Sequence, residues 1–483
     1  MADISTPDLC IIGGGTAGLI AAEAARERGL SVVLVERGLL GGPGLHSGGA
    51  AERALAAAAA RAHAMRNSAP FGIADAEAKI SMRQVHDHVQ SVVAKLAPQM
   101  SVERMTALGV EIIASEAAFS DPKTVRAGDQ IIRAKNFIIA TGSTTRMPDV
   151  DGLSDVPFFT AETIFENTRK LSHLVILGHG YAALEIAQSY KRLGSDVTVL
   201  SEGLALPDTD TELADLALRR LREGGVAIIE QASISVQSRS QGIGLTVKTG
   251  DREDRLDASH ILVAGERLPN LDGLALEKAR IRRSKTAPSQ LELAPGLRTS
   301  SAKIHVIGSA AGSPSPGHLA EHRARLVVDA IAFGAPASID KTNIPLVAFT
   351  DPQIAEVGLT EAAAKALRKA RYSILRANFA ENHRARAERQ PHGLVKLVVA
   401  ADGRLLGAGI VGEGAGELIA LFALAISKRL SAQDLASFVA PYPTYAEIAT
   451  RLGREFRGNA KPTAWQKQRA AFKRLLPKAP STT

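Results

Sequence analysis

The sequence predicts an α/β protein organised around two βαβ units of the dinucleotide-binding type. Residues 8–36 and 174–202 each contain, in order, an apolar strand, a glycine turn, a helix and a second strand. The two units begin about 165 residues apart, so each predicts a domain and a ligand of its own. The size of the chain agrees, because 483 residues with 45% hydrophobic side chains can bury several cores.

The first unit carries a complete G-x-G-x-x-G motif. Gly13 makes the tight turn, Gly15 lets backbone amides approach a diphosphate, and Gly18 permits close helix packing. Glu36 ends the second strand, where its carboxylate can accept hydrogen bonds from ribose hydroxyls. These residues together predict a bound dinucleotide at this turn.

The second unit repeats the motif with one substitution. Gly178 and Gly180 occupy the first two glycine positions, and Ala183 occupies the third. Ser201 stands at the ribose-reading position, with Glu202 beside it. A carboxylate there selects a free 2′-hydroxyl, whereas a small polar residue leaves room for a 2′-phosphate. The sequence therefore leaves NADH and NADPH open.

The segment between the units predicts further elements of the first domain. An alanine-rich helix begins near Ala54, a second helix is expected over about residues 81–108, and a strand follows at 110–113. An apolar strand then ends in Ala140-Thr141-Gly142-Ser143, where small side chains allow the backbone to pass close to a ligand. The chain thus returns to the first dinucleotide.

Charge and composition exclude several classes of protein. Residues 451–483 contain nine Lys or Arg and one acidic residue, so they account for the whole net charge of +8 and no nucleic-acid partner is predicted. The apolar run Leu418–Ile426 is too short to cross a bilayer and predicts a buried helix. The N-terminus shows no export signal, so a cytoplasmic location is expected.

Cysteine and histidine usage argues against disulfides and metals. Cys10 is the only cysteine, which excludes an intramolecular disulfide, and its apolar neighbours predict a buried strand residue. His86 and His88 lie two positions apart and so face different sides of a helix. No metal site is predicted.

These motifs, in this order, resemble the pyridine nucleotide-disulfide oxidoreductases, the family of dihydrolipoamide dehydrogenase, glutathione reductase and mercuric reductase. The resemblance covers positions 8 to about 455. It implies FAD on the first fold, NADH or NADPH on the second, and a homodimer whose active sites are shared between subunits. The matching segments are Ile12–Gly18, Ala140–Ser143, Gly178–Glu185, Arg267–Asn270, Ile304–Gly308, Phe349–Pro352, Val357–Glu361, Leu406–Gly412 and Ala415–Leu418.

The resemblance implies two Rossmann-like dinucleotide-binding domains and an α+β C-terminal dimerisation domain. The expected segments are 1–150 (FAD-binding domain, first part), 151–274 (NAD(P)-binding domain), 275–340 (FAD-binding domain, second part), 341–456 (dimerisation domain) and 457–483 (basic tail).

Motifs and resemblance together also name the expected site residues. Those expected at FAD are Gly13, Gly15, Gly18, Glu36, Gly42, Arg53, Ala117, Thr141, Gly142, Gly308 and Ser309. Those expected at the nicotinamide nucleotide are Gly178, Gly180, Tyr181, Glu185, Ser201 and Glu202. The catalytic residues expected are Arg53, Glu185, Tyr181, Tyr442 and Glu447.

The stretch 41–53 departs most from the family pattern. Gly44 and Gly49 stand where the family has its redox-active cysteines, and Arg53 replaces the lysine near the flavin. Tyr442 replaces the acid/base histidine of the partner subunit, while Glu447 is retained. Disulfide chemistry needs a thiolate and a base, so reduction of disulfides or mercury by the family's mechanism is excluded.

The retained residues predict direct transfer of electrons from the flavin to a small acceptor such as a quinone. In this hypothesis Arg53 pairs with Glu185, Tyr181 covers the flavin until nicotinamide arrives, and the space freed at Gly44 and Gly49 admits the acceptor. Tyr442, with Glu447 behind it, then donates a proton.

Other interpretations remain open from the sequence. Arg53 is alternatively an ordinary helix-surface arginine, and Tyr442 a packing residue. Hydride exchange between NADH and NADP, as in soluble transhydrogenases, needs no disulfide. A flavin-binding homologue that has lost catalysis is a further alternative, favoured by Ser309 in place of the family's aspartate and by Glu266 in place of a glycine.

The tail predicts a short basic amphipathic helix. Thr463 is a candidate cap, Pro477 a stop, and Trp465, Phe472 and Leu476 share one side. Such a helix either lies on the anionic inner face of a membrane or forms a solvated or dimer-docked tail.

Overall fold

The computed structural model describes residues 4–312, 315–335, 344–367, 371–459 and 468. It divides into two units, and each is described by itself. The first unit comprises residues 1–208 and 218–340, and the second comprises residues 209–217 and 341–483. The predicted tail helix around Trp465 lies outside the described residues.

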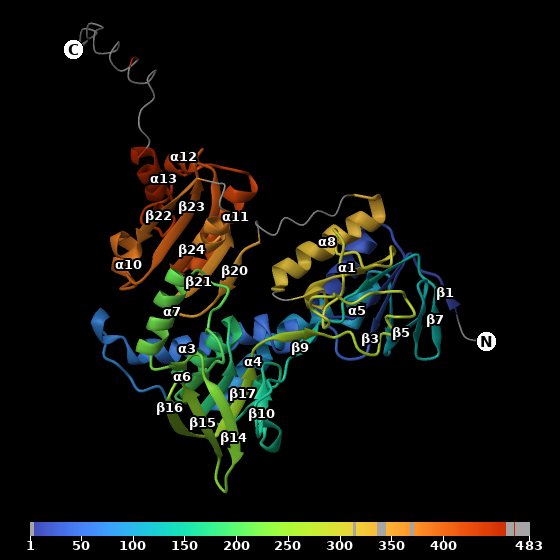
Figure 1. Ribbon diagram of the computed structural model, residues 1–483, viewed down its shortest axis with the longest axis horizontal. Coiled ribbons are helices and arrows are strands. Elements are labelled where there is room, and N and C mark those ends of the chain that lie inside the picture. The colour runs from blue at the N-terminus through green and yellow to red at the C-terminus, as the bar shows by residue number, and fades with distance from the viewer. Residues whose placement is uncertain (1–3, 313–314, 336–343, 368–370, 460–467, 469–483) are drawn as a thin grey trace. The chain divides into compact units, whose positions relative to one another are not determined.

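The first unit contains the parallel sheet of the first βαβ motif (Figure 1). Its strand order is β19-β8-β2-β3-β4, which is the doubly wound order with its switch point between β2 and β8. The register aligns Leu9 with both Val32 and Asn136. The strands are β2 (Leu9–Ile12), β3 (Val32–Glu36), β4 (Val110–Ala114), β8 (Asn136–Ile139) and β19 (Ile304–Val306). The predicted α/β class is confirmed.

Helices α1 (Thr16–Glu27) and α8 (Gly317–Phe333) pack side by side on this sheet (Figure 1). At one end, Arg28 pairs with Asp329, and Glu27 lies 3.4 Å from Arg325. At the other end, a Cβ added to Gly308, which precedes α8, would lie only 2.9 Å from Ala17 in the first turn of α1. The two helices therefore run in the same direction and begin at the same edge of the sheet.

A small mixed sheet, parallel between β1 and β7 and otherwise antiparallel, packs against the opposite face of the parallel sheet and encloses a core that includes Phe119 and Phe137, whose rings meet edge to face. Its strands, in spatial order, are β1 (Ile4–Ser5), β7 (Gln130–Ile132), β6 (Thr124–Ala127) and β5 (Ala117–Asp121).

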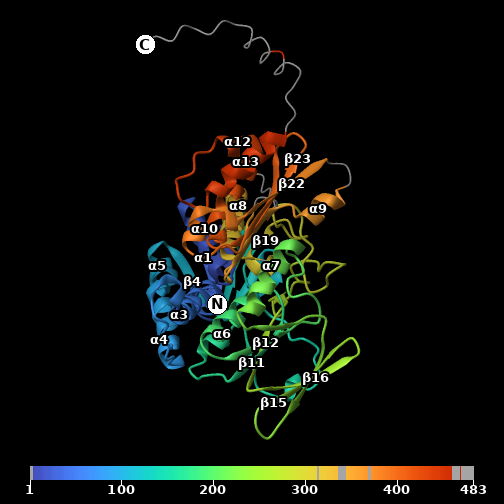
Figure 2. The ribbon, with the colours of Figure 1, turned by 90° about the vertical axis from the view of Figure 1, so that its left-hand side faces the viewer.

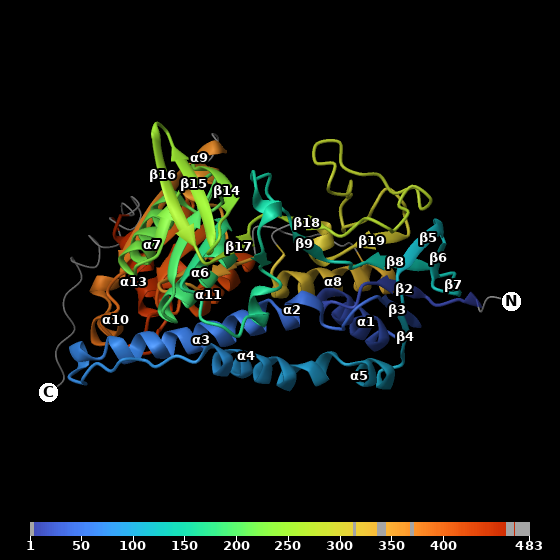
Figure 3. The same cartoon turned by 90° about the horizontal axis from the view of Figure 1, so that it is seen from below.

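A pair of long helices follows the first two strands and is seen from below in Figure 3. Helix α3 (Gly49–Arg66) lies beside α4 (Met82–Leu96), and α2 (Gly42–His46) precedes them. The prediction of a single helix over about residues 81–108 is wrong. Pro98 falls in the 3-10 turn Ala97–Met100, and Ser101 caps a new helix, α5 (Val102–Ala107), by accepting from the Arg104 amide at 3.2 Å.

The second βαβ motif forms another parallel sheet, in the order β10-β17-β11-β12-β13. The antiparallel sheet β14-β15-β16 belongs to the same part of the first unit, and Figure 2 shows its hairpin β15–β16. The elements are β10 (Phe158–Thr160), β11 (His173–Gly178), α6 (Tyr181–Arg192), β12 (Asp196–Leu200), β13 (Ala227–Ile229), β14 (Ser233–Ser238), β15 (Ile243–Thr249), β16 (Arg252–Ala258) and β17 (His260–Ala264). A two-stranded pair, β9 (Ser143–Thr145) and β18 (Arg267–Pro269), completes this unit.

The second unit is an antiparallel sheet covered by helices. Its strand order is β20-β21-β24-β23-β22, and α11 (Ala415–Ser427) contributes Phe422 to a continuous core. The strands are β20 (Leu346–Ala348), β21 (Gln353–Gly358), β22 (Tyr372–Asn378), β23 (Leu394–Ala400) and β24 (Leu405–Gly412). The other helices are the start of α7 (Thr211–Glu223), α9 (Glu361–Ala366), α10 (His383–Ala387), α12 (Ala432–Ser437) and α13 (Glu447–Asn459). No helix in the described ranges is long and apolar enough to span a membrane.

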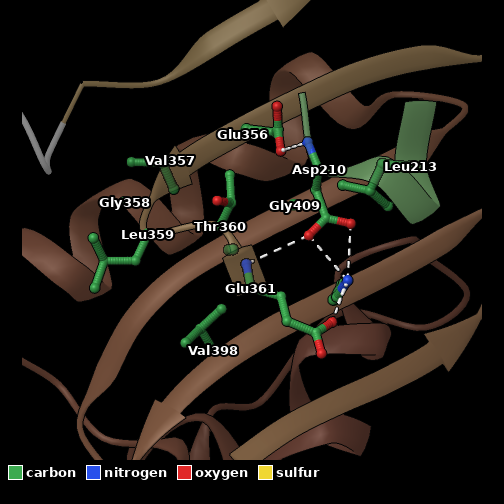
Figure 4. A pocket seen from close by; sticks show the side chains of 12 residues that line it. Asp210, Leu213, Glu356, Val357, Gly358, Leu359, Thr360, Glu361, Val398 and Gly409 are labelled. Carbon is green, nitrogen blue, oxygen red and sulfur yellow. Dashed lines mark hydrogen bonds and ion pairs between the residues drawn. The ribbon is translucent and has the colours of Figure 1, made fainter. Parts of the chain in front are cut away.

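A buried lysine organises charge within this second unit. Lys396 on β23 is 5% exposed and contacts Asp210 at 2.8 Å, Glu361 at 2.7 Å and Glu212 at 3.0 Å. Figure 4 shows the carboxylates of Asp210 and Glu361 directed toward the same amino nitrogen. Burial acts to lower the pKa of Lys396, but its hydrogen bonds to the three carboxylates outweigh burial and raise that pKa. This cluster attaches the segment 209–217 to the sheet.

Lys396→Met should lower the unfolding temperature of the second unit, with a loss of about 3–5 kcal/mol, because it leaves buried carboxylates without their cation. Differential scanning calorimetry of the full chain measures this unfolding temperature, with Lys365→Met, a substitution of an exposed lysine, as control. Equal shifts of the unfolding temperature in the two variants would contradict the expected role of Lys396.

Hydrogen bonding to Arg376 lowers the pKa of Glu212. The contribution of the Glu212 carboxylate to stability is therefore present above about pH 4.3 and is lost as the pH falls through the lowered pKa.

Candidate functional site

The first glycine turn, at residues 13–18, lies against the glycine pair Gly41 and Gly42. The Gly41 amide donates to the Gly14 carbonyl at 2.9 Å, and a Cβ added to Gly42 would lie 3.2 Å from the Gly15 Cα. Gly15 caps α1 and has no atom within 4 Å of its own added Cβ. The backbone at the start of α1 is therefore open, which suits the close approach of a diphosphate to helix N–H groups.

A cavity of about 120 Å³ opens beside these turns and brings together four expected FAD residues: Gly13, Glu36, Ala117 and Thr141. Glu36 accepts from the Gly14 amide at 2.5 Å and from the Gly38 amide at 2.6 Å. Thr141 Oγ1 is buried and has no hydrogen-bond partner among the described residues. Because buried hydroxyls are normally satisfied, this atom indicates a polar ligand in the cavity.

Two residues of the Arg267–Asn270 motif hold the turn that carries Thr141. Arg267 donates to Ser143 Oγ at 3.0 Å, to the Ser143 carbonyl at 2.7 Å and to Glu162 at 2.6 Å. The Asn270 amide donates to the Thr141 carbonyl at 3.1 Å. These hydrogen bonds therefore fix the position of the turn at residues 140–143.

Ser309, which stands where the family has an aspartate, also lies close to this turn. A Cβ added to Gly142, whose φ is +75°, would lie 3.8 Å from Ser309 Oγ, and Gly308 precedes that serine. The open Gly15 backbone, the unsatisfied Thr141 hydroxyl and the adjacent Ser309 fit the FAD expected from the sequence. The assignment of individual contacts stays a prediction.

The second glycine turn, at residues 178–183, makes a similarly close contact with a neighbouring strand. Gly178 has φ +146°, and a Cβ there would lie 1.9 Å from the Ala264 carbonyl oxygen. Gly180 caps α6 with φ +85°, and Ala183 is fully buried. Ala183 therefore packs inside the fold, as the smallest substitute for the third glycine does.

The two candidate ribose readers differ in exposure. Ser201 is 1% exposed, and its hydroxyl lies 3.4 Å from the Leu204 carbonyl, whereas Glu202 is exposed. Of these two residues, only Glu202 therefore has an exposed side chain at the end of β12.

Arg53 and Glu185 meet, as expected. Nη2 of Arg53 on α3 donates to Oε2 of Glu185 on α6, and Glu185 is 8% exposed. The ion pair joins α3, which follows the glycine-rich segment 41–48, to α6, the helix of the second βαβ motif. Tyr181 begins the same helix α6 one turn earlier.

The structure adds Glu52, which the sequence analysis did not assign a role. Burial raises the pKa of Glu52, while Arg53 and Arg267 oppose that shift. Burial thus favours the neutral acid of Glu52, whereas the two arginines favour its carboxylate. The place of Glu52 next to Arg53 is visible in the sequence, but its partial burial is not.

The prediction that replacing a cysteine by Gly44 frees space is wrong. A Cβ at Gly44 would lie 2.4 Å from Thr16 Oγ1, so the Thr16 hydroxyl already occupies that direction. A Cβ at Gly49 would meet only the Gly44 carbonyl oxygen, at 3.8 Å. Only the Gly49 side therefore retains room for a larger group.

Tyr442 has a neighbour that the sequence did not reveal. Its hydroxyl lies 3.2 Å from Nδ1 of His383, and the two rings meet edge to face at 5.9 Å. Glu447 accepts from the Thr444 amide at 3.1 Å, and Asn382 donates to the Thr444 carbonyl at 2.9 Å. The loop that carries Tyr442 is thus tied to the start of α10, which presents His383.

Comparison with known protein families matches nearly the whole chain. The model described as pyridine nucleotide-disulphide oxidoreductase matches residues 7–333, and that of the dimerisation domain of the same family matches residues 344–452.

Curated relatives are similar over their full length. A mercuric reductase of Streptomyces lividans is 33% identical over 458 residues, covering 93% of this chain and 96% of the relative. A dihydrolipoyl dehydrogenase of Geobacillus stearothermophilus is 33% identical over 455 residues, covering 91% and 94%. The crystal structure of LpdA from Mycobacterium tuberculosis is 25% identical, with a TM-score of 0.82, and covers 94% of this chain and 99% of its own.

Arg53→Met should weaken the contact between α3 and α6 by about 1–3 kcal/mol, because the largely buried Glu185 loses this guanidinium. A double-mutant cycle with Glu185→Gln, followed by thermal unfolding, measures the coupling. Arg61→Met, an exposed arginine on the same helix, is the matched control. Additive effects of the two substitutions would show that the pair contributes nothing.

Proposed function

We propose that this chain, which belongs to the pyridine nucleotide-disulphide oxidoreductase family and therefore uses FAD and NAD(P)H, passes electrons from its flavin directly to a small non-disulfide acceptor. Within this proposal, the small acceptor is a quinone. When bound, FAD supplies a centre that takes two electrons from NAD(P)H and releases them to the acceptor. The overall reaction converts NAD(P)H, a proton and a quinone into NAD(P)⁺ and a quinol.

The absence of a thiol in the stretch 41–53 carries this proposal. Gly44 and Gly49 occupy the family's cysteine positions, and the chain's one cysteine, Cys10, is fully buried in β2. Burial also raises the pKa of the Cys10 thiol, which disfavours the reactive thiolate. With no thiol to receive them, electrons leave for an external acceptor.

Arg53 has two parts in the proposal. It pairs with Glu185 and places a permanent cation on the flavin side, which favours negative charge on the ring. Tyr181, at the start of α6, covers the nicotinamide side until the nucleotide arrives.

Tyr442 supplies a proton to the acceptor in a homodimer. Its side chain is 70% exposed on the second unit, and His383 within hydrogen-bond distance is positioned to orient the hydroxyl and return the proton. Glu447 supports the same loop through the Thr444 amide. The family's dimerisation domain supports the homodimer that this arrangement needs.

NADH is the donor that the side chains favour. Glu202 is exposed at the ribose-reading turn while Ser201 is buried, and a carboxylate there accepts from a free 2′-hydroxyl and repels a 2′-phosphate.

A transhydrogenase is the second candidate function. The intact second glycine turn and the lack of cysteines at positions 44 and 49 support it equally. It differs from the first in accepting hydride from both nucleotides at similar rates.

Anaerobic mixing of the holoenzyme with NADH should bleach the flavin, with NADPH at least tenfold slower. Stopped-flow absorbance measures both rates, and a second mixing step adds benzoquinone, menadione, ferricyanide, oxygen or an NAD⁺ analogue. Bleaching by neither nucleotide would leave only the catalytically inactive alternative. Equal rates, with oxidation only by the nucleotide analogue, would favour the transhydrogenase.

Tyr442→Phe should slow flavin reoxidation by a quinone about 10²- to 10⁴-fold, the usual range for loss of a positioned proton donor. Flavin reduction by NADH should be unchanged, because Tyr442 belongs to the second unit whereas the nucleotide-binding turn of residues 178–183 belongs to the first. His383→Gln should give a smaller decrease, and the exposed His392→Gln serves as control. Unchanged reoxidation in Tyr442→Phe would remove this tyrosine from the chemistry.

A further inference from the structure

A cavity of about 390 Å³ lies within the second unit. It is lined by the start of α10, by the end of α12 with residues 438–440, and by one face of α13. Sites that bind small molecules measure about 300–1,000 Å³, so this cavity is large enough for one. No residue that we assign to FAD or to the nicotinamide nucleotide lines it, and neither does Tyr442.

Part of the cavity wall is apolar. Ile448 of α13 is 3% exposed, and Ala436 and Phe438 are half-buried. Val439 lines the same cavity and is 88% exposed. A flat apolar group bound here would remove the side chain of Val439 and its own surface from water, which is favourable in proportion to the area covered.

The charged side chains of the wall follow one face of α13. Glu447, Arg451 and Arg454 stand four and three residues apart along the helix and all line the cavity. Arg451 forms an ion pair with Glu381, and Glu447 accepts from the Thr444 amide at 3.1 Å. Arg454 is exposed, and its side chain has no ion pair or hydrogen bond among the described residues. Its guanidinium is therefore available to a ligand.

The two ends of the cavity differ in chemistry. Asn382 donates to the Thr444 carbonyl, and Glu447 accepts from the amide of the same threonine, so the start of α10 lies beside the start of α13. Arg454 follows Glu447 by seven residues, or about 10 Å along the helix axis. This separation exceeds the screening length of about 8 Å at physiological salt, so the Glu447 carboxylate neutralises little of the charge at Arg454.

His383 supplies a further polar group at the end opposite Arg454. It lines the cavity, and its Nδ1 lies 3.2 Å from the Tyr442 hydroxyl. Its Nε2 has no hydrogen bond among the described residues. The cavity thus combines an unpaired cation, an apolar wall and a ring nitrogen that is open to a ligand.

The chain that follows α13 does not provide the missing negative side chain. Residues 460–483 contain no Asp or Glu. A guanidinium binds a carboxylate through two parallel hydrogen bonds, which are stronger than hydrogen bonds between neutral groups. The group that complements Arg454 is accordingly the carboxylate of a small molecule.

We propose that this cavity is a binding site for a small aromatic carboxylate, with the carboxylate at Arg454 and the ring against Val439, Phe438 and Ile448. The site belongs to the second unit and is separate from both dinucleotide-binding motifs. The proposal does not depend on which electron acceptor the flavin uses.

The test is isothermal titration calorimetry of the full-length holoenzyme with three probes: 2-naphthoate, 2-naphthol and acetate. The first has a carboxylate and an apolar body, the second lacks the carboxylate, and the third lacks the apolar body. We expect 2-naphthoate to bind at one site per chain and the other two probes to bind at least tenfold more weakly. Saturating NAD⁺ should leave the affinity for 2-naphthoate unchanged, because the nucleotide-binding turn does not line the cavity.

Arg454→Met should weaken binding of 2-naphthoate about 10- to 100-fold, as expected for the loss of a charge-assisted hydrogen bond, and should not affect 2-naphthol. Val439→Asp should also weaken binding of 2-naphthoate, because it places a carboxylate beside the bound ring. The matched control is Arg404→Met, since Arg404 is exposed between β23 and β24 and does not line the cavity. Flavin absorbance and the unfolding temperature verify that each variant is folded.

Several results would overturn the proposal. It is wrong if 2-naphthoate shows no saturable binding, which is also the result expected if a partner subunit covers the cavity. It is wrong if the affinity in Arg454→Met stays within twofold of the wild type, or if Arg404→Met loses as much. Displacement of 2-naphthoate by NAD⁺ would assign the binding to the nucleotide site instead. None of these measurements involves quinone reduction, so the proposed function stands or falls separately.

Discussion

The architecture of the first unit depends on one contact made twice: a glycine turn pressed against the end of a neighbouring parallel strand. At Gly13 an added Cβ would lie 2.4 Å from the Ala140 carbonyl oxygen, and at Gly178 it would lie 1.9 Å from that of Ala264. No side chain fits either space. Because the turns close this tightly, α1 and α6 each begin directly at the carboxyl end of their sheet, where backbone donors are exposed to a ligand.

The two dinucleotide-binding motifs are linked by the ion pair of Arg53 and Glu185. This pair connects α3, which follows the glycine-rich segment 41–48, to α6, which begins at the second glycine turn. An arginine holds such a partner with a rigid planar group and stays charged at any physiological pH. The family's lysine is therefore replaced here by a more permanent cation.

Buried charge is handled in two opposite ways in this chain. Lys396 is surrounded by carboxylates, and its cluster holds the segment 209–217 on the second unit's sheet. Arg323 is buried to a similar degree, but its Nε and Nη1 lack partners within the described residues. The first arrangement is complete within the protein.

The sequence by itself determined the α/β class, both glycine turns, the family and the loss of the cysteine pair, because each of these is a local pattern or a residue identity at a known spacing. It also placed Arg53 with Glu185 through the resemblance. The tertiary structure decided what depends on distant neighbours: Thr16 occupies the space beside Gly44, and His383 meets Tyr442 across 59 positions. It also showed that Nε and Nη1 of Arg323 are buried and have no hydrogen-bond partner in the part of the chain that the structure describes. Burial and pairing arise only when separate elements pack together, so spacing along the chain carries no record of them.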